Sequence, residues 1–213
     1  MKHINDWHDK SIASTTVEAF KKNLFDAIYF ETSGEALEYI SQYIDKNSNI
    51  AFGGSVTIRD LGVRELARNK GANIVDHAQA GLSPEEKMET MRAELMSDVF
   101  ICSSNAVTLD GKLVNSDAIG NRVAAMSFGP KKVIVVVGTN KICRDEEAAL
   151  ERIEYEAGPK NAKRLNLNTP CTKIGRCMNC NNESRICRIY SILRRKPVYT
   201  DFEVVIVGEK LGF

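Results

Sequence analysis

The sequence predicts an α/β fold built on one mainly parallel sheet, with helices on both faces of that sheet. Segments of strand character alternate with segments of helical character along the chain, an order typical of parallel sheets. The strand segments are continuous apolar runs, such as residues 99–102 and 133–137, which indicates strands buried on both faces. Because no repeat or linker interrupts this order, we expect residues 1–213 to form a single domain.

The composition is that of an ordinary globular protein. The 213 residues are 43% hydrophobic and 27% charged, with a formal net charge of +1, so nothing favours a nucleic-acid partner, which usually needs a basic face. No apolar run approaches the roughly 20 residues of a membrane span, and the N-terminus lacks the apolar core of a signal peptide. We therefore expect a cytoplasmic protein without a membrane partner.

The first part of the chain predicts two helices. Apolar residues at helical spacing predict a helix within the N-terminal segment 1–26, and they are Val17, Phe20, Leu24 and Ile28. This helix would lie across the domain or contact a partner chain, as in a homodimer. Residues 27–30 can equally form a short edge strand. A second helix begins at a capping box, in which Glu35 follows Thr32 by three residues.

Residues 50–75 predict a strand, a glycine-rich turn, a helix and a second strand. The apolar residues 50–52 lead into the sequence Gly-Gly-Ser-Val-Thr at residues 53–57. Residues 58–70 have a helical pattern that ends at a glycine, and residues 72–75 form the next strand. Ser83 and Pro84 then mark the start of a further helix.

The second half of the chain is dominated by the two buried runs at residues 99–102 and 133–137. Between them, Asp110 and Gly111 predict a tight hairpin, and residues 120–127 a short helix. A helix capped by Asp145 follows, which we expect to stop at Gly158-Pro159. Residues 202–207 form the last predicted strand.

Three polar segments directly follow predicted strands: residues 53–57, 103–105 and 138–141. Ligands of parallel sheets gather at the carboxyl ends of the strands, so these segments are expected to share one crevice. Glycines and hydroxyls ahead of a helix can hold an anion, although residues 53–57 form neither a Walker loop nor a GxGxxG motif. The alternative is a plain strand-to-helix turn in which Ser55 or Thr57 caps the helix.

Several charged residues near these segments are candidates for a role in the crevice. Arg122 opens a predicted helix, where the dipole does not favour a cation, so it is a candidate for pairing with an acidic group or an anion. Lys141 follows a buried strand and could act as a point charge, or it could be a solvated loop lysine. Asp110 fits a turn residue at least as well as a general base.

Four cysteines fall within a short segment, 171–187, with the spacing C-x5-C-x2-C-x6-C. Clustered cysteines in a reducing compartment are more often metal ligands than disulfides, so we expect zinc or an iron–sulfur cluster on Cys171, Cys177, Cys180 and Cys187. The alternatives are small buried residues or an oxidised pair. The histidines, His3, His8 and His77, show no catalytic or metal pattern.

The middle of the chain resembles a known family, the LUD domain (DUF162) of lactate utilisation proteins B and C and of many single-domain relatives. The cysteine tail resembles that of a single-domain subgroup, and Gly53-Gly54-Ser55 fits the upstream glycine turn of the family. The resemblance rests on SNAVTLDG (104–111), NSD (115–117), GNRVAA (120–125), GP (129–130) and VGTNKI (137–142).

The resemblance implies a fold like that of ribose-5-phosphate isomerase, glucosamine-6-phosphate deaminase and the CoA transferases (NagB/RpiA/CoA transferase-like). Those relatives bind small anionic molecules at strand ends, and an Asp acts in proton transfer in their isomerases, which makes Asp110 and Asp117 candidate catalytic residues. The family name implies a role beside an iron–sulfur lactate oxidation complex. This chain lacks the ferredoxin-type motifs of protein B.

The leading hypothesis is therefore a protein that binds a small anionic metabolite, a hydroxy acid or a sugar phosphate, at the strand ends. The candidate ligand-binding residues are Gly53, Gly54, Ser55, Thr57, Asn105, Asn121, Arg122 and Lys141. The alternative is a non-catalytic accessory subunit that joins the other subunits of an iron–sulfur redox complex through a metal-held cysteine loop.

Overall fold

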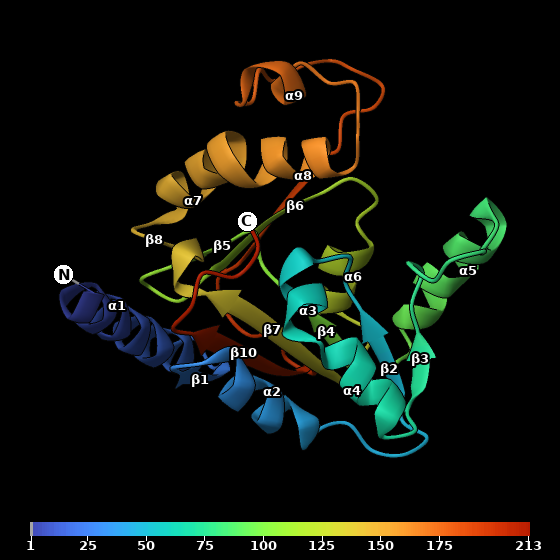
Figure 1. Ribbon diagram of the computed structural model, residues 1–213, viewed down its shortest axis with the longest axis horizontal. Helices are drawn as coiled ribbons and strands as arrows, with labels where there is room; N and C mark the ends of the chain where they lie inside the picture. The colour runs from blue at the N-terminus through green and yellow to red at the C-terminus, as the bar shows by residue number, and fades with distance from the viewer. Residues whose placement is uncertain (1) are drawn as a thin grey trace.

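The computed structural model describes residues 2–213 and contains the expected parallel sheet (Figure 1). All five pairs of neighbouring strands in this six-stranded sheet run parallel. In spatial order the strands are β1 (Asp26–Phe30), β10 (Asp201–Val207), β7 (Lys132–Gly138), β4 (Val99–Cys102), β2 (Asn49–Phe52) and β3 (Asn73–Val75). The predicted α/β class and its strands are confirmed.

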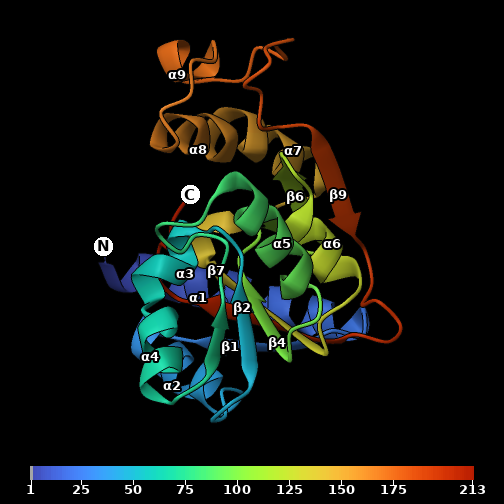
Figure 2. The same ribbon diagram turned by 90° about the vertical axis from the view of Figure 1, so that its right-hand side faces the viewer.

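Helices cover both faces of the sheet, as Figure 2 shows. One apolar cluster fills the face that carries α2 (Ser33–Ser41), α3 (Val56–Leu61) and α4 (Val63–Asn69). The opposite face carries α1 (Lys2–Lys22), α5 (Pro84–Glu94) and α6 (Asn121–Ser127). The capping boxes predicted at Thr32 and Ser83 begin α2 and α5.

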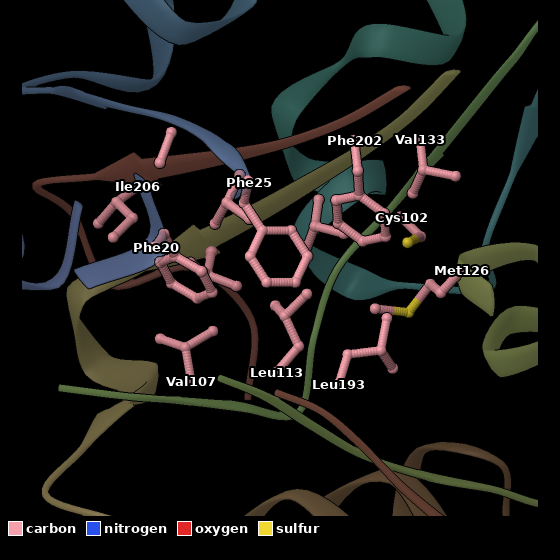
Figure 3. Packing of buried hydrophobic residues seen from close by; sticks show 14 of the residues in the cluster. Phe20, Phe25, Cys102, Val107, Leu113, Met126, Val133, Leu193, Phe202 and Ile206 are labelled. Carbon is pink, nitrogen blue, oxygen red and sulfur yellow. The ribbon is translucent and has the colours of Figure 1, made fainter. Parts of the chain in front are cut away.

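A second, four-stranded sheet packs against the face that carries α1. Its strands, in spatial order, are β8 (Ile142–Cys143), β5 (Ala106–Thr108), β6 (Leu113–Asp117) and β9 (Ile189–Leu193). The predicted hairpin at Asp110-Gly111 joins β5 to β6. Figure 3 shows Leu113 of this sheet facing Phe20 and Phe25. The strands β8 and β9 were not predicted, because the first has two residues and the second follows the polar cysteine segment.

Two helices between residues 50 and 170 differ from the prediction. The helix expected over residues 58–70 breaks at Gly62, which has a φ of 76° and separates α3 from α4. The helix expected to stop at Gly158-Pro159 instead continues. It runs from α7 (Glu146–Arg152) through η2 (Ile153–Ala157), a π-helical stretch, into α8 (Gly158–Arg164). The wider π turn lets the chain pass Pro159, which takes a first-turn position of α8 where no N–H is needed.

The cysteine segment forms the top of the molecule in both ribbon views, beyond one end of the main sheet. It contains a single turn of helix, α9 (Cys171–Ile174), and then runs without regular structure to β9. At the other end of the chain, α1 buries Val17 and Phe20 and ends at Lys22. The predicted helical positions Leu24, which is 60% exposed, and Ile28, in the edge strand β1, lie beyond its end. No helix within residues 2–213 combines the length and the apolar character that crossing a bilayer requires.

Candidate functional site

The three polar segments predicted to share a crevice do meet. A cavity of about 390 Å³ opens at the carboxyl ends of β2, β4 and β6, and it is lined by residues from all three segments. The predicted residues that line it are Gly54, Ser55, Thr57, Asn105, Asp117, Asn121, Arg122 and Lys141. The continuous helix of α7, η2 and α8 forms the opposite wall through Ile153, Ala157 and Gly158. The site is therefore a partly open crevice of metabolite size.

Lys141 lies at the base of this cavity, in the short 3-10 helix η1 (Thr139–Lys141) that follows β7. Its side chain is only 2% exposed. The ammonium Nζ donates hydrogen bonds to Thr57 Oγ1 at 2.9 Å, Ser103 Oγ at 2.9 Å and the Ser104 carbonyl at 3.2 Å. No carboxylate in the described chain pairs with it. Burial, with the nearby Arg152 and Arg122, lowers the pKa of Lys141 to about 7.

Arg122 contacts several segments of the site, and its charge is already paired with a carboxylate. Its guanidinium forms an ion pair with Asp117, to whose Oδ1 it also donates from Nε at 3.0 Å. Further bonds run from Nη1 to the Ser103 carbonyl at 2.9 Å and from Nη2 to Asn105 Oδ1 at 2.8 Å. The other oxygen of Asp117 accepts from the backbone N–H of Val123 at 3.1 Å. Arg122 thus ties β4, β6 and α6 together, and Asp117 has few free lone pairs for a base.

Two predicted site residues lie outside the cavity. Gly53 is buried, and a Cβ at this position would meet Cys102 Cβ at 2.8 Å, so the glycine is required by packing. Asp110 lies at the hairpin turn with its side chain 55% exposed, paired with Lys112 at 2.7 Å. Partial burial raises the pKa of Asp110, but hydrogen bonds from Lys112 and Thr108 outweigh it and lower the pKa. Its position and partners are those of a turn residue.

The glycine turn supports the crevice differently from the expectation. Because α3 has six residues, it provides little of the helix dipole that the sequence suggested. Ser55 stands at its N-cap position with a side chain that makes no cap hydrogen bond, so the hydroxyl is available to the cavity. Thr57 is fully buried, donates to the Leu211 carbonyl and accepts from Lys141. Its role is to orient the lysine.

Two residues that line the crevice were missed from the sequence, His77 and Arg164. His77 follows β3, so the strand-end rule that selected the other segments would also have selected it. Its ring Nδ1 lies 2.5 Å from Oε1 of Glu94, which is 1% exposed. Arg164 ends α8, in a helix that the sequence was expected to stop earlier. It donates to the side chain of Asn161 and pairs with no carboxylate of residues 2–213.

The four clustered cysteines line a second, smaller cavity of about 30 Å³. Its other walls are mainly apolar and come from η2, α8 and β9. The backbone N–H of Cys177 donates to the Glu154 carbonyl in η2 at 2.8 Å, and the Asn179 N–H donates to Cys177 Sγ at 3.3 Å. Cys187 lines both cavities. The cysteine segment and the crevice are therefore direct neighbours.

Comparison with known proteins covers most of the chain. A family model described as the LUD domain matches residues 13–207. A DUF162 family protein of known structure from Deinococcus radiodurans is 13% identical, with a TM-score of 0.53 over 93% of this chain and 97% of that one. This likeness, over nearly the full length of both chains, confirms the fold.

Two further solved structures match about half of the chain. They are eIF2B beta from Chaetomium thermophilum (16% identity, TM-score 0.38, 54% of this chain and 44% of that one) and ribose 5-phosphate isomerase from Plasmodium falciparum (15%, 0.33, 53% and 52%). Both scores are below 0.5, so these two matches support no conclusion about function. A search of curated proteins found no significant match.

Proposed function

Because this chain belongs to the LUD domain family, we propose that its strand-end crevice binds a small anionic metabolite, a hydroxy acid or a sugar phosphate. The observation that carries the proposal is the buried ammonium of Lys141, which faces the cavity with hydroxyl and carbonyl partners but no carboxylate. A buried cation without an ion-pair partner is costly, and an anionic ligand would supply the missing charge.

The charges of the side chains that line the cavity also support an anionic ligand. The cationic or protonatable side chains that line it are Lys141, Arg122, Arg164 and His77, and the carboxylate side chain among the lining residues is Asp117. The ion pair with Arg122 neutralises that carboxylate, which leaves an excess of positive charge. Ser55 and Asn121 add uncharged donors beside it, as is usual where an anion must be oriented.

Isothermal titration of the purified protein with a panel of anions tests the proposal. The panel contains inorganic sulfate and phosphate, ribose 5-phosphate and lactate, so that it compares a bare dianion, a sugar phosphate and a hydroxy acid. We expect at least one anion to bind with one-to-one stoichiometry, and added salt to weaken the binding only moderately, because the charge is buried. Neutral ribose is the control. Failure of every anion to bind would contradict the proposal.

A second candidate function is that of an accessory subunit of an iron–sulfur redox complex, and one observation favours it. Cys171, Cys177, Cys180 and Cys187 surround one cavity with mainly apolar walls, and all four are free thiols. Bound there, a cluster would supply one-electron transfer. This role would place a redox group next to the crevice, since Cys187 contributes to both walls.

The four sulfurs are not gathered as closely as a single zinc ion would hold them. Four thiolates on one zinc ion at about 2.3 Å lie within about 4 Å of one another. Within residues 2–213, the three-residue group whose ligand atoms all fall within 4.8 Å contains no cysteine. A four-iron cluster holds its thiolates further apart, because each binds a different iron. Zinc and an iron–sulfur cluster, the two metal groups predicted from the sequence, are therefore both candidates, and metal analysis distinguishes them.

Metal analysis of anaerobically purified protein tests this second candidate. We expect about four irons with labile sulfide per chain and a brown colour, and Cys177→Ser and Cys180→Ser should each reduce the iron content. Cys143→Ser is the matched control, because that half-buried cysteine lies in β8, away from the cavity. Stoichiometric zinc, or an iron content that does not depend on Cys177, would contradict the cluster.

A further inference from the structure

The histidine that lines the crevice is held by a buried carboxylate. His77 lies beyond β3, and Glu94 is the last residue of α5. Glu94 Oε1 accepts from the backbone N–H of His77 at 3.0 Å and contacts its ring Nδ1 at 2.5 Å. Two contacts to one carboxylate oxygen fix both the backbone and the ring of His77. The ring therefore has one defined orientation, with Nδ1 turned to Glu94.

The second ring nitrogen of His77 is directed to the glycine turn of the crevice. A Cβ built on Gly54 would lie 3.7 Å from His77 Nε2, and both residues line the cavity. No residue in the described part of the chain shares a hydrogen bond with Nε2, whereas Nδ1 is occupied. An imidazole whose Nδ1 is held by a carboxylate has Nε2 available for proton exchange.

We propose that His77 is the proton-transfer residue of the crevice and that Glu94 is its positioning residue. The proposal rests on the proposed function, since the proton passes to or from a bound anion. Its ligand class is a small anion that also carries a carbonyl or hydroxyl oxygen within reach of Nε2. In the forward direction the Nε2–H bond of the imidazolium breaks and an O–H bond forms on that oxygen in its anionic alkoxide or enolate form, while the now neutral ring keeps its proton on Nδ1. The reverse step returns the proton to Nε2.

The charged groups around His77 favour a proton over a metal ion. Asp76, His77 and Glu94 bring ligand atoms within 4.8 Å of one another, but Arg64 occupies the cationic position of this cluster. Its Nε lies 2.8 Å from Asp76 Oδ2, an ion pair too bent for a hydrogen bond. Asp76 Oδ1 accepts from the Ala78 N–H. Both oxygens of Asp76 are thus committed, which leaves two ligands for a metal.

The same groups set the protonation of His77. The hydrogen bond with Glu94 raises its pKa above the ordinary value, with further help from the charges of Glu94 and Asp76, while burial and Arg64 act in the opposite direction. The second oxygen of Glu94, Oε2, is buried without a hydrogen-bond partner, so the carboxylate depends on His77 for its stabilisation. These contacts therefore favour the imidazolium form of His77 over the neutral ring.

Nitrogen-15 NMR of the imidazole rings tests the pair directly, because the chain has only three histidines. His3 and His8 are exposed on α1 and serve as internal references. We expect neutral His77 to be the Nδ1–H tautomer, and Glu94→Gln to move its titration midpoint to lower pH. Glu89→Gln on the exposed face of the same helix is the matched control. A neutral His77 with its proton on Nε2, or a midpoint unmoved by Glu94→Gln, would overturn the proposal.

Titration with inorganic phosphate then tests whether His77 contacts the bound anion. We expect phosphate to shift the His77 Nε2 resonance and leave those of His3 and His8 in place. Calorimetric binding of phosphate without any change at His77 would overturn the inference and leave the proposed function intact. If no anion binds, the proposed function is contradicted. The tautomer of His77 and its titration midpoint would still show whether Glu94 positions the ring. Selective broadening of His77 by Mn²⁺ would favour a metal site and overturn the proton-transfer role.

Discussion

Replacement of Arg122 by alanine is expected to lower the free energy of unfolding by about 3–5 kcal/mol, the usual cost of leaving one partner of a buried ion pair alone. The side chains of Arg122 and Asp117 are 15% and 9% exposed, so solvent screens the pair little. The alanine variant also removes the donors to the Ser103 carbonyl and to Asn105. Urea unfolding followed by circular dichroism measures the difference.

Arg59→Ala is the matched control for this experiment. Arg59 pairs with the adjacent Asp60 on the exposed side of α3, where both side chains are largely in solvent. Exposed pairs of this kind contribute about 0–1 kcal/mol, so this variant should unfold almost like the wild type. A loss of under about 1 kcal/mol for Arg122→Ala would mean that the residue is free for a ligand. We expect the larger loss of stability. Because destabilisation would also weaken anion binding, the test of a ligand contact is made at Lys141 and not at Arg122.

Lys141→Met is expected to weaken sulfate binding by about 10- to 100-fold, since a hydrogen bond to a charged group contributes about 1.5–3 kcal/mol. Methionine keeps the length and apolar stem of the side chain but removes the ammonium that faces the cavity. Titration calorimetry measures the affinity, and Lys131→Met, at an 80% exposed lysine, controls for net charge. Equal affinity of Lys141→Met and wild type would contradict the role of Lys141.

The pH dependence of stability, compared between wild type and Lys141→Met, separates the effect of Lys141 from that of the other titrating groups. The folded protein holds the pKa of Lys141 at about 7, below its value of 10.5 in the unfolded chain. The folded state therefore binds fewer protons between these values, and the contribution of this group to stability rises from pH 7 to pH 10.5 and falls as pH decreases towards 7. Lys141→Met should lack this rise in urea unfolding. Sulfate keeps its charge over the range, so its affinity for wild type should decline above pH 7 as the free lysine loses its proton.

The fold was predictable because burial on both faces leaves a direct mark on the sequence. The runs at residues 99–102 and 133–137 are apolar at every position or nearly so, and only a strand covered on both sides needs this. The polar segments that follow them were equally predictable as neighbours, because the carboxyl ends of parallel strands share one edge of the sheet. Lys141, Ser55 and Asn121 were selected in this way and do line the cavity.

The roles of the residues at that edge were less predictable. Asp117 was assigned to a base, and Arg122 either to an acidic partner or to an anionic ligand. The structure pairs the two with each other across the start of α6, so the acidic partner of Arg122 is Asp117 itself. Asp110 was assigned a catalytic role through a family resemblance, whereas it lies in an exposed hairpin turn. His77 showed no catalytic pattern, because its partner Glu94 stands 17 positions away on another helix. Local spacing contains no information on such contacts.

The sequence by itself determined the parallel sheet, the edge at which the site lies and the presence of a cysteine cluster, since these follow from local apolar patterning and from composition. That the cluster adjoins the site came from the structure. The tertiary structure decided which polar groups are already satisfied and which remain open to a ligand. From the sequence, Lys141 could equally be a solvated loop lysine. In the structure it is buried, and its ammonium contacts Thr57, 84 positions earlier, and Ser103, 38 positions earlier. The physical reason is that desolvation and hydrogen bonding depend on contacts between distant parts of the chain, and these exist only after the sheet has formed.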